Sequence, residues 1–219
     1  APMSRVLIVT DNFPPDVPGG ISLVTYDLAA CLPAPRVVVL APLGPQSKSF
    51  DEAQDFRIVR LPFSTRSRAT TVLSCVRFSL GALRWARREH CAVLYLAKPW
   101  PLGVAGLVAQ LAGIPYVVHT HGSDIFRQRG MVRDALCSLI LRRSSCVIAN
   151  SEFTRALAVR SGARPEQTAV LYPKVDPRRF QEPFDAVAFA ETEGLVGKRV
   201  LLTVGRLANP RKGIDRVLE

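Results

Sequence analysis

Three segments of the sequence combine glycine, histidine, acidic and basic residues at spacings that suit a phosphorylated ligand. The first is Asp11-Asn12-Phe13-Pro14-Pro15, which is followed after three residues by the pair Gly19-Gly20. A glycine pair between a strand and a helix lets a ligand approach the backbone, and the first helical turn offers free N–H groups to a phosphate. A plain tight turn explains the pair equally well.

The second segment is His119-Thr120-His121-Gly122-Ser123-Asp124, at the end of an apolar run that we expect to be a strand. Doubly wound folds bind ligands at the carboxyl ends of their strands. Because strands curl at their ends, only the later histidine, His121, is expected in the crevice. Zinc would need a third ligand, and the remaining histidine, His90, lies near a basic helix end, so we predict no metal site.

The third segment, residues 205–213, reads Gly-Arg-Leu-Ala-Asn-Pro-Arg-Lys-Gly. We expect it to join a strand to a helix, which would place the guanidinium of Arg206 and the ammonium of Lys212 beside a helix N-terminus. This combination suits a diphosphate, and an ordinary solvated basic loop is the alternative. Neither the dinucleotide fingerprint G-x-G-x-x-G nor a Walker loop occurs in the sequence, which disfavours nicotinamide and P-loop chemistry.

The elements that must position these segments follow from hydrophobic periodicity. Short β-branched runs alternate with longer segments of helical spacing, which predicts an α/β fold with a Rossmann-like, doubly wound parallel sheet. Strands are expected at residues 5–10, 36–40, 56–61, 92–96, 116–120, 146–149 and 168–171. Helices are expected at residues 20–32, 71–89, 101–112, 126–143 and 152–161.

The same pattern divides the chain into three parts. Residues 1–180 are predicted to form one Rossmann-like domain, and the polar, acidic stretch 181–198 is predicted to be a connector with room for one helix. Residues 199–219 begin with Arg-Val-Leu-Leu-Thr-Val, which predicts a buried strand over 199–204, followed by a turn and the start of a helix. Because these elements cannot bury their apolar faces alone, we expect either the truncated start of a second domain or a tail packed onto the first.

The net charge of +11 is concentrated in residues 56–144, which hold 14 lysines and arginines but three acidic residues. Such clustering suits an anionic membrane surface, with a solvated cationic face as the alternative. Nucleic acid is disfavoured because aromatic residues make up only 7% of the chain and no recognition motif occurs. The helix predicted at 71–89 has an apolar stripe that we expect to face the core: Leu73, Val76, Leu80 and Leu83.

The composition also indicates the cellular compartment in which the protein is expected to work. Hydrophobic residues make up 48% of the chain, as in a globular protein, but no run reaches the roughly 18 uninterrupted apolar residues of a membrane-spanning helix. The five cysteines are odd in number and none shows C-x-x-C spacing, so we expect buried, reduced thiols. We therefore predict a cytoplasmic location, with peripheral contact to the inner membrane surface through residues 56–144.

Taken together and in this order, the segments resemble the retaining glycosyltransferases of family four, whose GT-B architecture consists of two facing Rossmann-like domains. The resemblance covers essentially the whole chain. It rests on Asp11-Asn12-Phe13-Pro14-Pro15 with Gly19-Gly20, Thr120-His121-Gly122, Ala149-Asn150-Ser151-Glu152-Phe153-Thr154, Val175-Asp176 with Phe180, and Gly205-Arg206-Leu207 with Arg211-Lys212-Gly213. The N-terminal pattern looks most like that of bacterial phosphatidylinositol mannoside mannosyltransferases.

The resemblance implies where a nucleotide-sugar donor would bind. The amides of Gly19 and Gly20 would face the donor diphosphate and sugar, and Arg206 and Lys212 would hold the diphosphate. No cofactor or metal is implied. The nucleotide base and ribose would belong to the second domain, so this chain would hold the acceptor half and only part of the donor site.

The resemblance also implies a catalytic role for His121, which would contact the transferred sugar, and a less direct one for Asp124. Two positions depart from the family pattern. Lys174 stands where a glycine often precedes the Val-Asp pair, and Ser123-Asp124 stands where close relatives have His-Glu, which keeps the carboxylate and loses the second histidine. Because of these two departures, the resemblance does not define the identity of the substrate.

The function that these implications favour is transfer of a hexose, with mannose as the first candidate, from a nucleotide diphosphate sugar to an acceptor hydroxyl, with a lipid as the first candidate acceptor. The chain alone is expected to be inactive. One alternative is a non-catalytic half-module that binds a lipid or a partner subunit. Another is a different GT-B activity such as sugar-nucleotide epimerisation, which the turn at 205–213 makes less attractive.

Overall fold

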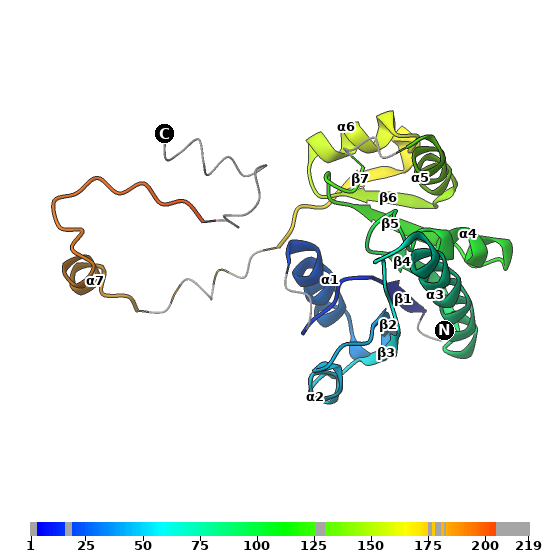
Figure 1. Ribbon diagram of the computed structural model, residues 1–219, viewed down its shortest axis with the longest axis horizontal. Helices are drawn as coiled ribbons and strands as arrows, with labels where there is room; N and C mark the ends of the chain where they lie inside the picture. Colours follow the sequence, from blue (N-terminus) through cyan, green and yellow to red (C-terminus); the bar gives the residue numbers. More distant parts are fainter. Residues whose placement is uncertain are drawn as a thin grey trace. The chain divides into compact units, whose positions relative to one another are not determined.

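The computed structural model describes residues 4–15, 19–125, 130–174, 177, 181 and 183–204. Its centre is a parallel seven-stranded sheet in the order β3-β2-β1-β4-β5-β6-β7 (Figure 1). The strands are β1 (Arg5–Val9), β2 (Val37–Pro42), β3 (Arg57–Leu61), β4 (Cys91–Leu96), β5 (Tyr116–Thr120), β6 (Cys146–Ala149) and β7 (Thr168–Val170). The predicted doubly wound α/β sheet is confirmed, and all seven strands lie where periodicity placed them to within two residues.

Helices cover both faces of the sheet, with α1 on one side and α3 and α4 on the other (Figure 1). Their bounds are α1 (Gly20–Cys31), α2 (Ser47–Glu52), α3 (Arg68–Arg88), α4 (Val104–Leu111), α5 (Met131–Arg143) and α6 (Glu152–Arg160), with 3₁₀ turns at Ala34–Arg36 and Pro165–Gln167. Six residues are too few to show helical periodicity, so α2 is not predicted from the sequence. The expected first residues of α5, 126–129, lie outside the described ranges.

Alternate residues of the strands build an apolar cluster on each face of the sheet. Along β1, Leu7 and Val9 belong to one cluster and Ile8 belongs to the other. The first cluster includes Phe78 of α3, and the second includes Ala29 of α1. Burial on both faces explains why the strands read as continuous β-branched runs.

The buried face of α3 is not the predicted one. Leu73, Val76 and Leu80 are 55%, 50% and 61% exposed, so the expectation that this stripe faces the core is wrong. The buried face carries one large residue and several small ones: Ser74, Phe78, Ser79, Ala82 and Ala86. Small side chains let a helix lie close to a sheet and pack densely against it.

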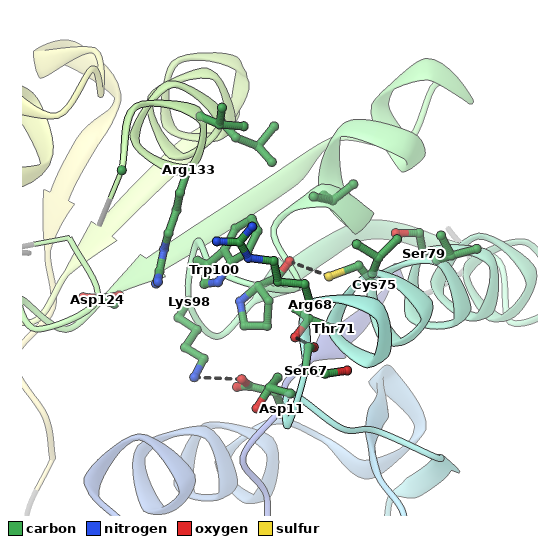
Figure 2. Close-up of a pocket in the computed structure, with 18 of the residues that line it drawn as sticks. Asp11, Ser67, Arg68, Thr71, Cys75, Ser79, Lys98, Trp100, Asp124 and Arg133 are labelled. Atoms are coloured by element: carbon green, nitrogen blue, oxygen red, sulfur yellow. Dashed lines mark hydrogen bonds and ion pairs between the residues drawn. The ribbon is translucent and has the colours of Figure 1, made fainter. Parts of the chain in front are cut away.

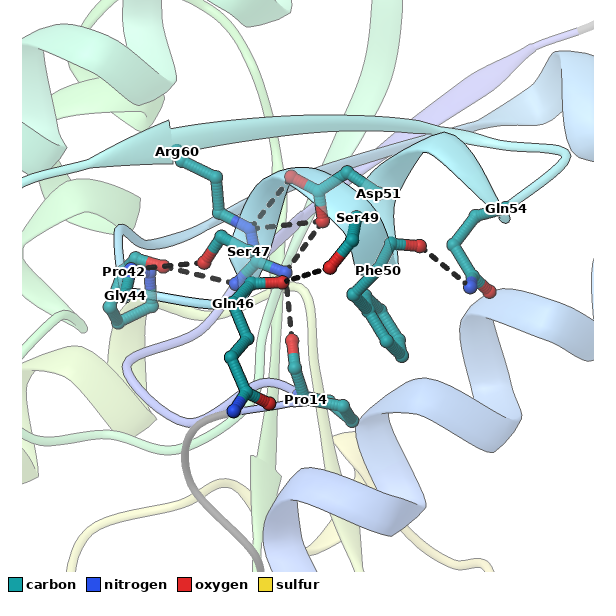
Figure 3. A network of polar contacts seen from close by, with 10 residues as sticks. All are labelled: Pro14, Pro42, Gly44, Gln46, Ser47, Ser49, Phe50, Asp51, Gln54 and Arg60. Carbon is teal, nitrogen blue, oxygen red and sulfur yellow. Dashed lines mark hydrogen bonds and ion pairs between the residues drawn. The ribbon is translucent and has the colours of Figure 1, made fainter.

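A half-buried network anchors the loop after β1 to the edge of the sheet (Figure 3). Arg60 of β3 donates from Nη2 to the Asp51 carboxylate at 2.7 Å, and Nε donates to both carboxylate oxygens. The same guanidinium donates to the main-chain oxygens of Pro14, at 2.7 Å, and Pro42, at 3.0 Å. The guanidinium also lies 5.5 Å from the centroid of the Phe13 ring. Arg60 therefore fixes the segment that leads to the Gly19-Gly20 turn.

Residues 1–174 and 175–219 form two separate compact units. In the second unit, the helix expected in the connector is confirmed as α7 (Ala186–Thr192), which Asp185 caps through the N–H groups of Val187 and Ala188. The strand expected over 199–204 is wrong for the described residues: they are irregular, and Leu201 is 91% exposed. A strand needs a neighbour to pair its backbone groups. The domain boundaries proposed at 180 and 198 stay predictions.

All five cysteines are free, as expected. Only Cys91 and Cys137 are buried, and Cys31 is exposed, so the expectation of buried thiols holds for two of the five. Across the described ranges, no helix has the length and apolar character needed to cross a membrane.

Candidate functional site

The carboxyl ends of β1, β4 and β5 meet where the strand order reverses, which is where doubly wound folds bind ligands. β1 and β4 are neighbours, with Val9 paired to Leu96, and β5 lies on the other side of β4. The segments that follow these strands carry Asp11, Lys98 and His121. The sheet thus brings together polar residues that are far apart in the sequence.

Asp124 closes the turn after β5 onto the backbone of His121. Both carboxylate oxygens accept hydrogen bonds from the main-chain N–H of His121, at 3.0 and 3.2 Å. Gly122, between them, has a φ of 86°, a left-handed conformation that favours glycine. Burial raises the pKa of Asp124 above its ordinary value, while the charge of His121 and the backbone donors act against that rise. The structure therefore joins the two predicted catalytic residues in one turn.

The ring of His121 is oriented by the end of the neighbouring strand. Its Nε2 lies 3.0 Å from the main-chain oxygen of Ala97. A carbonyl oxygen can only accept, so Nε2 carries a proton in this bond. Burial lowers the pKa of His121, and Asp124 opposes that change. In the neutral ring, Nδ1 is then the nitrogen that can accept a hydrogen bond from a ligand.

His119 is a core residue that supports His121. It is 2% exposed, its Nδ1 hydrogen-bonds the hydroxyl of Tyr95, and its ring centroid lies 4.2 Å from that of His121. Burial lowers the pKa of His119 to about 3, so the ring is neutral at physiological pH. Within the described ranges, no three His, Cys, Asp or Glu side chains form a group that could hold a metal ion. A metal-free site stays a prediction.

The Gly19-Gly20 pair lies at the start of α1. Gly19 has an extended backbone and no side chain to cap the helix, and its oxygen accepts from the N–H of Leu23 to begin the first turn. A Cβ added to Gly20 would meet nothing within 4 Å among the described atoms. Ile21, the next residue, lines the cleft described below. Uncapped first-turn N–H groups beside open space suit an anionic ligand.

A cleft of about 1340 Å³ lies at these strand ends. Asp11, Lys98 and Asp124 form its polar side, and α3, α4 and α5 contribute the rest of its wall (Figure 2). Figure 2 shows Lys98 reaching toward Asp11, with Asp124 and Arg133 nearby. The cleft is large enough for a sugar-sized ligand with an attached chain.

The helical wall of the cleft is apolar with cations beside it. The exposed apolar residues of the wall are Val72, Val76 and Leu80 of α3, and Met131 and Val132 of α5. Arg66 and Arg68, at the start of α3, are exposed at the same cleft, and the Arg133 guanidinium lies 5.0 Å from the centroid of the Trp100 ring. The stripe that periodicity assigned to the core therefore partly lines the cleft.

Sequence reasoning missed the ion pair between Lys98 and Asp11. Nζ of Lys98 lies 2.8 Å from Oδ2 of Asp11, and the two side chains are only 18% and 7% exposed. Burial raises the pKa of Asp11, while the charge of Lys98 acts against that rise. The sequence carries only part of the signal, a charged residue two positions beyond the last residue of each of two strands, Val9 and Leu96, and it does not record that these strands are neighbours. The predicted donor residues Arg206 and Lys212 lie outside the described ranges.

Sequence comparisons find similar proteins and a family model that are named as glycosyltransferases. A family model described as "Glycosyl transferase 4-like domain" matches residues 19–174. The chain is 27% identical over 219 residues to the GDP-mannose-dependent alpha-(1-6)-phosphatidylinositol monomannoside mannosyltransferase of Mycolicibacterium smegmatis, covering 97% of this chain and 55% of that protein. The chain thus spans about half the length of the curated relatives it matches.

Solved structures share the fold. HepE of Anabaena, in complex with UDP, superposes with a TM-score of 0.67 at 21% identity, covering 87% of this chain and 50% of HepE. Sucrose-phosphate synthase of Thermosynechococcus elongatus gives a TM-score of 0.62 at 16% identity, covering 87% of this chain and 52% of that one. The fold agrees with the GT-B architecture that the sequence motifs imply. The family model matches residues 19–174, which include strands β2 to β7 of the sheet. The chain therefore belongs to the glycosyl transferase 4-like family.

Proposed function

We propose that the chain is the acceptor-binding half of a retaining glycosyltransferase, which moves a hexose from a nucleotide diphosphate sugar to a hydroxyl of a lipid-borne acceptor. Mannose is the first candidate sugar, because the matched mycobacterial relatives are named as GDP-mannose-dependent mannosyltransferases. The observation that carries the proposal is the cleft, whose polar side holds Asp124 next to His121 and whose helical wall is apolar.

The proposed chemistry uses no metal and no covalent nucleophile. The bond from the sugar C1 to the donor phosphate oxygen breaks, and a bond from C1 to the acceptor oxygen forms on the same face. The acceptor proton passes to the departing phosphate. Fixed donors at the diphosphate would stabilise the leaving group, and the uncapped start of α1 at Gly19 and Gly20 supplies backbone N–H groups for this.

A lipid acceptor accounts for the wall of the cleft. A soluble sugar would not require the exposed side chains of Val76, Leu80 and Met131, whereas an acyl or prenyl chain would bury them. The surplus of cations in residues 56–144 would attract an anionic membrane surface at the same time. We therefore propose peripheral contact with the inner membrane surface.

Transfer assays on the full-length protein test the proposal. A panel of radiolabelled GDP- and UDP-hexoses is offered with a lipid acceptor fraction, and the anomeric configuration of the product is read by NMR. We expect a lipid-extractable product that keeps the donor configuration. No transfer from any donor would favour the half-module reading, and an inverted product would contradict the retaining mechanism. The 219-residue chain alone is expected to show no turnover.

A further inference from the structure

A polar pair of side chains lies in the core next to His121. The hydroxyl of Tyr95, in β4, hydrogen-bonds Nδ1 of His119, in the neighbouring strand β5, and the two rings meet edge to face with their centroids 5.9 Å apart. The two residues are 6% and 2% exposed. Nε2 of His119 is buried and has no hydrogen-bond partner among the described residues. The pair therefore leaves one polar ring atom unpaired in the core.

This arrangement is less stable than an apolar core would be. A buried polar atom without a partner loses its hydration, and no protein contact compensates for that loss. The surroundings are apolar, since Ile8 and Val117 belong to or pack against the cluster that contains Tyr95. Residues that break the rule of their surroundings are expected at functional sites. The contact that sets His119 apart from its apolar neighbours is the one with His121.

The ring of His119 supports the ring of His121 from one face. The two ring centroids lie 4.2 Å apart, and the ring planes make an angle of 35°. The outer torsion of a histidine side chain is broad unless contacts restrict it. The bond from Nε2 of His121 to the oxygen of Ala97 fixes one edge of the ring, and the flat face of His119 limits rotation about that bond. Tyr95 restricts His119 in the same way, because its hydroxyl holds Nδ1.

The support is uncharged. Burial lowers the pKa of His119 to about 3, so the ring is neutral at physiological pH and does not repel a proton on His121. Because Nε2 of His119 has no partner among the described residues and Nδ1 is bonded to Tyr95, the ring has no hydrogen bond through which it could pass a proton to His121. What His119 offers to its neighbour is the face of a flat ring.

We propose that His119 is a positioning residue for the transfer reaction, which holds the imidazole of His121 so that Nδ1 faces the bound sugar, and that Tyr95 holds His119 in turn. This inference rests on the proposed function, which gives His121 a sugar to act on. His119 itself contacts neither the sugar nor the acceptor. Its ring face performs the role, and its ability to bind a proton is not needed.

Two double variants of the full-length protein separate the ring from its nitrogens. Tyr95→Phe with His119→Phe, the phenylalanine variant, removes both polar groups and keeps a flat ring next to His121. Tyr95→Phe with His119→Leu, the leucine variant, removes the ring as well. The leucine variant should lower kcat about tenfold and leave the KM of the nucleotide sugar and of the acceptor unchanged. The phenylalanine variant should keep kcat within about threefold of the wild-type value.

Urea unfolding of the same proteins distinguishes positioning from a structural role. Both double variants should unfold at a urea midpoint equal to or above that of the wild type, because each removes the unpaired nitrogen from the core. Val117→Ala, two residues earlier on the same face of β5, is the matched control and should lower the midpoint without changing kcat. Tyr95→Phe alone, which only loosens His119, should lower kcat about threefold and provides the test if a double variant does not fold.

Histidine tautomers in the 219-residue chain test the geometry without turnover. Long-range ¹H–¹⁵N spectra of chain labelled with ¹⁵N-histidine should show His121 protonated on Nε2 in the wild type and in the phenylalanine variant. In the leucine variant, the population protonated on Nδ1 should rise about tenfold, because the ring can turn away from Ala97. An unchanged tautomer in the leucine variant would overturn the inference.

The kinetic outcomes separate this inference from the proposed function. If transfer occurs and the leucine variant keeps the wild-type kcat, the inference fails while the proposed function stands. Equal losses of kcat in both double variants would also overturn it, since the nitrogens and not the ring face would then matter, as would a kcat that falls only together with the urea midpoint. If the tautomers change as described and no nucleotide sugar supports transfer, the proposed function fails while the contact between the two histidines stands.

Discussion

The imidazole of His121 donates from Nε2 to the main-chain oxygen of Ala97, 3.0 Å away, and so ties the end of β5 to the end of β4. The backbone N–H of Ala97 in turn donates to the oxygen of Val9 in β1, at 3.0 Å. These two bonds link the three strand ends that form the polar side of the cleft. The orientation of the His121 ring is therefore set by the sheet and does not depend on a flexible loop.

His121→Ala in the full-length protein should lower kcat about 100-fold, because a preoriented group at the transferred sugar acts mainly in the transition state. Loss of this half-buried side chain should cost less than about 2 kcal/mol in the free energy of unfolding. Steady-state kinetics and urea unfolding check both values. Near wild-type kcat would remove His121 from the mechanism, and an unfolded variant would show that the residue is mainly structural.

Binding to vesicles checks the proposed membrane contact. The 219-residue chain should bind vesicles rich in anionic lipid and not neutral ones, and it should dissociate as salt approaches 1 M, where the screening length is about 3 Å. Replacing Arg84, Arg87 and Arg88 together by Gln should weaken binding by about 3 kcal/mol at low salt, at about 1 kcal/mol per cation. Equal binding to neutral vesicles would point to a different kind of attachment.

The apolar side of α3 gives a second test of the lipid proposal. The double variant Val76→Ser with Leu80→Ser should reduce binding of a lipid acceptor, since it removes apolar area from the wall of the cleft. It should hardly change the free energy of unfolding, because both residues are at least half exposed. Leu111→Ser, at a 90% exposed position that does not line the cleft, is the matched control. A fall in thermal stability without a change in acceptor binding would contradict the assignment.

Arg60→Met should destabilise the fold by about 3 kcal/mol, because it leaves the Asp51 carboxylate and two carbonyl oxygens without their donor. The side chains of Arg60 and Asp51 are 7% and 21% exposed. Glu152→Gln is the comparison: the ion pair of Glu152 with Arg155 spans 3.8 Å between side chains that are 69% and 42% exposed, and should contribute less than about 0.5 kcal/mol. Equal urea midpoints for the two variants would refute this ranking.

The buried ring of His119 should contribute stability that is lost on acidification. Its pKa drops from the ordinary 6.5 to about 3 on folding, so between these values the unfolded chain binds a proton that the folded chain does not. The contribution of His119 to the free energy of unfolding should therefore decrease by about 1.4 kcal/mol per pH unit as the pH falls through this window. The raised pKa values of Asp11 and Asp124 act in the opposite sense, with stability lost as pH rises above their unfolded values.

The His119 contribution is isolated by comparing variants. Urea unfolding between pH 6.5 and 4 should show that His119→Asn loses less stability on acidification than the wild type does, whatever its stability at neutral pH. His90→Asn, at an exposed turn position with a φ of 51°, is the control for removing a histidine. An identical slope for His119→Asn and the wild type would show that the buried ring is not the source of acid sensitivity.

The sequence predicts the strands well because each central strand is buried on both faces, which makes its residues apolar without interruption. The buried face of α3 could not be predicted in this way, since the side chains that contact the sheet, such as Ala82 and Ala86, carry a weak hydropathic signal. The ion pair between Asp11 and Lys98 could not be predicted from the local sequence either. It depends on β1 and β4 being neighbours, and strand order is a property of the whole sheet that no local pattern records.

Gly81 sets how closely α3 approaches the edge of the sheet. A Cβ at this position would meet Cδ1 of Leu61 at 2.7 Å, so any larger residue would push the helix outward or displace the leucine. The opposite side of the same helix lines the cleft. A larger residue at position 81 that pushed the helix outward would therefore change the width of the cleft without replacing any residue that lines it.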